Sequence, residues 1–376
     1  MNTWMDIVRE LEDAAAHPRQ AVLRAMRETG RNAVGCFPIY APEEIVYAAG
    51  LLPVGMWGGP TRGRMADKYL QTFCCSVMRA NTEQALRDDY NMLSAVILTT
   101  FCDTLKCVSE NWKSAAPQLG LIPMVYPQNR KSASGKQFLR EELMRVSDEL
   151  ERVTGCRATS ESLEESVDVY DDWRAAMQEF TALLPNHPRV FDAKRRHLIL
   201  KSVFFMDKKT HAERIKYVSA QLRRLSAESE PRKRVILSGL LCEPVEILDI
   251  ITENGMQVVA DDLAQESRQF RTVAPRAGDA LNRMVTRIAL QDGCTFLYDE
   301  SKSRGAMLVD MVRREKADGV IFCQLKFCDP DEFDYPILKE ELAAARIPLL
   351  HIEIEQQMDS PEQIRTRVQS FAEMLG

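Results

Sequence analysis

The chain has 376 residues, of which 45% are hydrophobic and 28% are charged, and its formal net charge is −6. This length predicts two or three domains, and the composition excludes a disordered tail protein, a collagen and a coiled-coil rod. The mildly acidic balance has no electrostatic footprint for nucleic acid and argues against a polybasic membrane anchor. We therefore expect neither a nucleic-acid partner nor a membrane partner.

The apolar runs of the sequence are far too short for a membrane-spanning helix. The first twenty residues are acidic and amphipathic, and they lack the basic start and the apolar core of a signal peptide. A cytoplasmic location is therefore expected.

Strands and helices are predicted to alternate over the first third of the chain. Apolar residues at helical spacing predict helical structure over residues 1–30. The elements predicted after it are strand 33–37, helix 42–50, strand 52–56, helix 77–87, strand 95–99 and strand 122–126. This alternation favours a parallel sheet with crossover helices over residues 31–135.

Residues 136–229 are charged and have no strand pattern, so they are predicted to form a helical linker region. Its predicted helices are 138–154, 163–184 and 195–225.

The last third, residues 230–376, alternates again and predicts a second α/β domain. Its predicted elements are strand 234–239, helix 244–254, strand 257–260, helix 279–292, helix 305–316, strand 319–324, helix 334–345, strand 348–353 and helix 361–375. The expected fold is therefore two doubly wound, Rossmann-like domains with parallel sheets, joined by a helical segment. In such sheets, ligands bind beyond the carboxyl ends of the strands.

The sequence contains ten cysteines, at positions 36, 74, 75, 102, 107, 156, 242, 294, 323 and 328. In a cytoplasmic protein they are expected to be reduced thiols, and most free cysteines are small buried hydrophobic residues. The alternative is that a subset binds a soft metal or an iron–sulfur cluster.

Three cysteines lie where ligand-binding residues are expected. Cys102 follows the strand at 95–99, and Cys328 follows the strand at 319–324. Cys75 precedes a predicted helix, whose free N–H groups favour a thiolate. Three thiolates from separate loops, meeting in a cleft between two domains, would suit an iron–sulfur cluster.

Spacing alone does not establish such a cluster, because the chain has no CxxC motif. Cys36 and Cys74 remain open as additional ligands. The cysteines interpreted as packing residues are Cys107, Cys156, Cys242, Cys294 and Cys323.

Several longer motifs occur in the chain. They are GCFP at 35–38, PEEIVYAAGLLPVG at 42–55, CDTL at 102–105, YPQNR at 126–130, VADDLAQESR at 259–268, KFCDP at 326–330 and RTR at 365–367. On these motifs, which follow one another across nearly the whole length, the chain resembles the 2-hydroxyacyl-CoA dehydratase / benzoyl-CoA reductase family. It is most similar to the smaller (β) subunits of the dehydratases.

The resemblance implies a [4Fe–4S] cluster held by Cys75, Cys102 and Cys328, the same three cysteines that the predicted topology selects. The fourth ligand in such subunits is not a protein cysteine, and this sequence does not reveal it. The resemblance also implies an α subunit as partner, which carries a second cluster and binds most of the 2-hydroxyacyl-CoA substrate. A separate ATP-dependent iron–sulfur activator protein would supply the starting electron.

The reaction that the resemblance implies is dehydration of an (R)-2-hydroxyacyl-CoA to a 2-enoyl-CoA. The β-hydrogen of an acyl-CoA is too weakly acidic for ordinary elimination. One electron on the thioester carbonyl makes a ketyl radical anion, which expels the hydroxyl group and acidifies that hydrogen. The electron then returns to a cluster, so this chain would be the electron-relaying half. It has no GxxxxGK[ST] motif, which agrees with ATP being used elsewhere.

Two alternatives stay open. A related reductase of the benzoyl-CoA type, or a double-cubane electron carrier, would keep the electron or bind a larger cluster. A non-catalytic scaffold subunit would use its cysteines only for packing.

Other polar residues have a structural and a functional interpretation. Glu43 and Glu44 are expected to favour a helix start by their charge, with a catalytic base as the alternative. Asp103 and Asp329 are expected to cap helices or loops, with orientation of the cluster loops as the alternative.

A buried ion pair of Asp261 and Asp262 with Arg268 is predicted. The five histidines are not expected to bind metal, and the absence of a GxGxxG motif argues against a dinucleotide.

Overall fold

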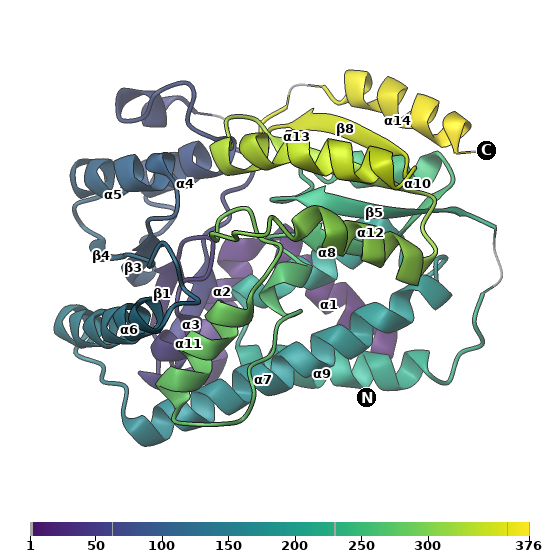
Figure 1. The fold of residues 1–376 in the computed structure, drawn as a ribbon. Coiled ribbons are helices and arrows are strands. Elements are labelled where there is room, and N and C mark those ends of the chain that lie inside the picture. Colours follow the sequence, from purple (N-terminus) through teal and green to yellow (C-terminus); the bar gives the residue numbers. More distant parts are fainter. Residues whose placement is uncertain (1–2, 62, 229–230, 359, 376) are drawn as a thin grey trace.

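The computed structural model describes residues 3–61, 63–228, 231–358 and 360–375. The structure has two four-stranded sheets, all parallel. Figure 1 shows β1, β3 and β4 of the first sheet at the left and β5 and β8 of the second at the upper right, with helices around both. This confirms the predicted fold class, two doubly wound parallel sheets with intervening helices. None of the helices in these residues is long and apolar enough to cross a membrane.

The first sheet has the strand order β2-β1-β3-β4. The chain leaves β1 toward one edge and returns through β3 toward the other, so the sheet has a topological switch point between β1 and β3. Its elements are β1 (Ala33–Cys36), α3 (Glu43–Ala48), β2 (Leu52–Gly55), α4 (Ser76–Leu86), β3 (Leu93–Thr99), α5 (Asp103–Ala115) and β4 (Gly120–Met124).

The second sheet repeats this arrangement with the order β6-β5-β7-β8, and its switch point lies between β5 and β7. Its elements are β5 (Lys233–Gly239), α10 (Glu246–Glu253), β6 (Met256–Leu263), α11 (Ala280–Leu290), α12 (Arg304–Glu315), β7 (Gly319–Leu325), α13 (Asp329–Ala344), β8 (Leu349–Ile354) and α14 (Glu362–Met374).

The two N-terminal helices and the helices of the predicted linker region form a helical layer that packs against the sheets. Figure 1 shows α7 and α9 side by side, with α1 near α8. These helices are α1 (Trp4–Ala16), α2 (Pro18–Thr29), α6 (Ala133–Thr154), α7 (Ser160–Leu183), α8 (Ala193–Ser202) and α9 (Lys208–Leu222). One apolar core runs through both sheets and this helical layer. The domain division at 1–30, 31–135, 136–229 and 230–376 stays a prediction, and its boundary at 229/230 lies outside the described residues.

Three helix predictions were wrong. The predicted helix at 195–225 is two helices, because Asp207 caps α9 by accepting the Thr210 backbone N–H at 3.0 Å. No helix was predicted at α5, although its buried residues follow helical spacing. Helix α13 begins at Asp329, five residues before the predicted start at 334. The prediction was misled by Pro336, which lies inside the helix but resembles a helix start in the sequence.

Gly239 shows how tightly the second switch point is built. It ends β5 with φ of +138°, and a Cβ at this position would lie 2.2 Å from the carbonyl oxygen of Cys323 on β7. Gly239→Ala is therefore expected to lower the free energy of unfolding by about 3 kcal/mol, through backbone strain and overpacking. Urea denaturation measures this loss.

Gly255→Ala is the matched control, because Gly255 also has a positive φ, +72°, but has no atom within 4 Å of the added Cβ. It should cost only about 1 kcal/mol. Equal losses in the two variants would contradict the close approach at Gly239.

Candidate functional site

The two switch points face one another across a shared apolar cavity. Cys75, Cys102 and Cys328 all line it. The position of Cys102 and Cys328 after strands, and that of Cys75 before a helix, had pointed to such a meeting. The segments after β1, β3, β5 and β7 contribute much of the rest of the wall, and the start of α4 and the segment between α11 and α12 complete it. The other lining residues are Pro38, Ile39, Val77, Met78, Thr104, Leu105, Leu240, Phe296, Phe327, Asp329 and Pro330.

Each of the three cysteines is the N-cap of a helix. Cys75 precedes α4, Cys102 precedes α5 and Cys328 precedes α13. The Cys102 sulfur accepts the backbone N–H of Leu105 at 3.4 Å. Three helix N-termini therefore direct free N–H groups and positive dipole ends at one cavity, an arrangement that stabilises negative charge on sulfur.

Burial nevertheless dominates the protonation of these thiols. It raises the pKa of Cys75 to about 12 and raises the pKa values of Cys102 and Cys328 as well. Neighbouring cysteines add to the effect at Cys75 and Cys328, and Asp329 and Asp103 add to it at Cys102. Backbone N–H groups of Met78, Leu105 and Asp331 act in the opposite direction but are weaker. The helix N-terminus favours a thiolate at Cys75, but in the free protein desolvation opposes it and is the larger effect.

The donor set fits a multi-iron cluster better than a single ion. Three thiols, two of them buried and that of Cys102 partly buried, line one cavity. Iron in a cluster takes thiolate ligands by displacing their protons. Across the described ranges, no group of three or more His, Cys, Asp or Glu side chains is arranged to hold a single metal ion. A cluster does not require that closeness, because each cysteine binds a different iron atom.

The remaining cysteines do not line this cavity. Cys36 borders a separate internal cavity near Glu43, and Cys74 is buried beside Cys75 without reaching the shared cavity. Cys242, Cys294 and Cys323 are buried, as predicted, and Cys156 is partly buried. The prediction that Cys107 packs in the core was wrong, because Cys107 is exposed on α5.

The acids that follow two of the cysteines are not caps. Asp103 and Asp329 are the first residues of α5 and α13, since the cysteines themselves occupy the cap positions. The Asp103 side chain is 87% exposed and pairs with Lys106 at 3.0 Å. The predicted capping role was therefore wrong.

Glu44 is held in an internal ion pair. Its carboxylate contacts Arg174, and it lies 3.4 Å from Arg287. Burial raises its pKa, but the two guanidinium groups outweigh burial and lower it to about 2. Glu43 pairs with Lys208 at 2.9 Å. Both acids therefore have ion-pairing roles, and Glu44 has no proton affinity suited to a base near neutral pH.

The predicted pairing at 261–268 is correct for one of the two acids. Asp262 accepts from Arg268 at 2.9 Å, and both side chains are completely buried. Asp261 instead pairs with Arg196 of α8. His351 lies in β8, as predicted.

A buried polar network behind Cys75 could not be recognised in the sequence. Gln356 donates to Glu243 at 2.6 Å, and its backbone N–H donates to Ser76 at 3.1 Å. Glu243 also pairs with Lys201 and lies 3.5 Å from His197. Since these residues come from four distant segments, no local pattern links them.

His197 gives this network a pH dependence. Burial lowers its pKa, but hydrogen bonds to Glu243 and Glu266, the latter at 2.7 Å, outweigh burial and raise the pKa from 6.5 to about 9. A raised folded-state pKa stabilises the fold below pH 6.5, and this contribution is lost as pH rises through 9.

Replacing His197 is therefore expected to change how stability varies with pH. The charged imidazolium contributes about 3 kcal/mol below pH 6.5. When the pH is raised from 6 to 10, the free energy of unfolding of the wild type should fall by this amount relative to that of His197→Gln, as measured by urea denaturation. His17→Gln, at a largely exposed position, should keep the wild-type profile. Parallel curves for the wild type and His197→Gln would contradict the raised pKa.

Comparisons with known proteins identify the family of the chain. The family described as 2-hydroxyglutaryl-CoA dehydratase, D-component, matches residues 38–375. The chain is 41% identical to lactoyl-CoA dehydratase subunit beta of Anaerotignum propionicum, over 98% of each chain. It is 38% identical to the (R)-phenyllactyl-CoA dehydratase beta subunit of Clostridium sporogenes, over 97% of this chain and 98% of that protein.

A more distant relative is one of the subunits of benzoyl-CoA reductase from Thauera aromatica, with 25% identity over 93% of this chain and 92% of that protein. The resemblance inferred from the motifs is thereby confirmed, as is the expected enzyme class. The chain belongs to the 2-hydroxyglutaryl-CoA dehydratase D-component family and is a subunit of a hydro-lyase.

Proposed function

We propose that this chain is the β subunit of an oxygen-sensitive iron–sulfur 2-hydroxyacyl-CoA dehydratase, in which Cys75, Cys102 and Cys328 hold a [4Fe–4S] cluster. The observation that carries the proposal is that these three cysteines cap three helices around one apolar cavity. When bound, such a cluster supplies low-potential one-electron transfer.

The chain's own residues would perform three tasks at this site. The cysteines bind through sulfur, and the helix N-termini favour the negative charge of the bound thiolates. Apolar lining residues such as Leu240, Phe296 and Val77 exclude water. Exclusion of water and the local charge set the reduction potential of such a group, so the wall is part of the proposed function.

The proposed reaction is dehydration of an (R)-2-hydroxyacyl-CoA to a 2-enoyl-CoA. The names of the beta-subunit relatives, which act on lactoyl-CoA and phenyllactyl-CoA, support this class. In this proposal an α subunit binds most of the substrate, and an ATP-dependent iron–sulfur activator delivers the electron that this chain relays. A cytoplasmic location fits the ten free cysteines.

A reductase subunit of the benzoyl-CoA type is the second candidate, supported by the similarity to the benzoyl-CoA reductase of Thauera aromatica. A larger double-cubane cluster would need further sulfur ligands. The location of Cys36 and Cys74 away from the shared cavity supports the smaller cluster.

The test is reconstitution without oxygen. The chain is purified with its α subunit and supplied with activator, ATP and reductant. An (R)-2-hydroxyacyl-CoA should give a 2-enoyl-CoA over many turnovers per electron supplied, because the electron is recovered. Reduction of an aromatic thioester with stoichiometric consumption of electrons would favour the reductase, and no turnover of either substrate class would contradict the proposal.

A further inference from the structure

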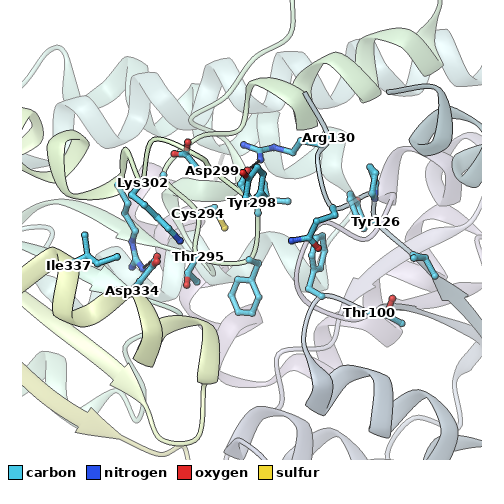
Figure 2. A pocket seen from close by; sticks show the side chains of 18 of the residues that line it. Thr100, Tyr126, Arg130, Cys294, Thr295, Tyr298, Asp299, Lys302, Asp334 and Ile337 are labelled. Atoms are coloured by element: carbon cyan, nitrogen blue, oxygen red, sulfur yellow. Dashed lines mark hydrogen bonds and ion pairs between the residues drawn. The ribbon is translucent and has the colours of Figure 1, made fainter. Parts of the chain in front are cut away.

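A second and larger cavity, of about 500 Å³, lies beside the cysteine cavity. Figure 2 shows Thr100 and Tyr126, which follow β3 and β4, on one side, and Lys302, Asp334 and Ile337 on the other. This volume falls in the range of sites that hold small organic molecules. None of the predicted site residues lines it.

Four cationic side chains and two anionic ones line the cavity. Arg304 is neutralised by Asp262, Asp331 and Asp334. Arg130 donates to backbone carbonyls, among them that of Ile288 at 2.9 Å.

Two lysines complete the cationic set. Lys106 pairs with Asp103 at 3.0 Å. Lys302 has no side-chain partner in the described part of the chain, so it leaves positive charge available for a ligand.

The backbone around Lys302 is firmly held. The Asp299 carboxylate accepts the backbone N–H of Ser301 at 3.2 Å and that of Ser303 at 3.0 Å. Lys302 lies between them with φ of +49°, a left-handed conformation that is unfavourable for lysine. Figure 2 shows its side chain directed into the cavity. The backbone of Lys302 is therefore held in place, and its side chain brings an ammonium group to the cavity mouth.

Other parts of the wall are aromatic and aliphatic. The rings of Phe101 and Tyr126 lie 4.3 Å apart between centroids, and Phe296 lies 6.4 Å from Phe101. Ile337 and Leu338 of α13 complete the apolar surface. A ligand with an apolar body and an anionic head would match both this apolar part of the wall and Lys302.

We propose that this cavity binds an aryl or alkyl carboxylate, with its carboxylate at Lys302 and its body against Phe101, Phe296 and Ile337. The proposal goes beyond the dehydratase function and does not depend on it, since none of the three cysteines lines the cavity. The two cavities share Phe296, so a bound carboxylate would lie next to the cysteine site.

Calorimetry on the full chain, purified with its partner subunit, tests this site with 3-phenylpropionate and its neutral isostere 3-phenylpropionamide. The carboxylate should bind, and Lys302→Gln should weaken its binding about fivefold or more, because a charge-assisted hydrogen bond is lost. Ile337→Trp, which fills the cavity, should weaken it about tenfold.

Lys316→Gln is the matched control, because Lys316 is also exposed and also has φ of +49°, but does not line the cavity. It should bind the carboxylate as the wild type does. Equal binding of carboxylate and amide, unchanged binding in both Lys302→Gln and Ile337→Trp, or no binding at millimolar carboxylate would each overturn the proposal. Iron content, measured on the same samples, reports on the cluster separately.

Discussion

Replacement of Cys75, Cys102 or Cys328 by serine is expected to remove the iron of the chain and to abolish dehydration. A hydroxyl group at any of the three cap positions is a hard and weakly acidic ligand for iron, so each variant loses a soft donor from the cavity. Iron should fall from about four atoms per chain to below one. Activity should fall at least about 100-fold, more than is usual when an outer-shell partner is lost.

The cysteines outside the cavity provide matched controls. Cys107 lies on α5, one turn beyond Cys102, and is exposed, whereas Cys156 is partly buried after α6. Cys107→Ser and Cys156→Ser should keep the iron content and activity of the wild type. Full iron content in all three cap variants would contradict their assignment as ligands.

The second large effect is expected on the free energy of unfolding when the completely buried Asp262 is replaced by asparagine. Its carboxylate accepts from Arg268 at 2.9 Å, from Arg271 at 2.5 Å and from Arg304 at 3.0 Å. Asp262→Asn keeps the shape of the side chain but leaves three guanidinium groups without their shared anion. We expect the free energy of unfolding to fall by about 3–5 kcal/mol, the usual cost of breaking a buried ion pair.

The loss of stability expected for Asp262→Asn also depends on pH. Burial raises its pKa, but Arg268, Arg304 and Arg271 outweigh burial and hold the pKa far below its usual value. A depressed folded-state pKa stabilises the protein above the unfolded pKa, near 4, and this stabilisation is lost as pH falls further. The wild type and Asp262→Asn should therefore converge in stability at strongly acidic pH.

Urea denaturation at neutral pH and at acidic pH measures both effects. Asp310→Asn is the control, since Asp310 is 75% exposed and lies 3.9 Å from Arg313. It should change stability by less than about 0.5 kcal/mol. A loss in Asp262→Asn no larger than in this control would contradict a structural role for the buried cluster.

The sheets and the three cap cysteines could be predicted because their signals are local. Buried apolar runs mark the strands. In a parallel sheet, residues that directly follow a strand lie at the edge formed by the carboxyl ends of the strands, where ligands bind. Cys102 and Cys328 follow β3 and β7 directly, so the strand pattern alone placed both at the edge that forms the cavity.

The parts that were missed depend on tertiary contacts or on ambiguous local signals. Cysteine is not a preferred N-cap residue, so the start of α5 after Cys102 carried no recognised signal. Gln356 and Glu243 meet across 113 residues, and burial outweighs the helix dipole at Cys75 only because the other loops close over it. Lys302 is distinguished by having no side-chain partner among the described residues, and a sequence cannot show which charged groups are paired.

The central claim is that three cysteines of this chain hold one four-iron cluster. The most direct test is the iron and acid-labile sulfide content of the chain, purified with its α subunit under strict exclusion of oxygen. With correction for the cluster that the α subunit itself carries, we predict about four irons and four sulfides per chain. About eight irons would contradict the single cluster and favour a double cubane, and absence of iron would contradict the iron–sulfur assignment altogether.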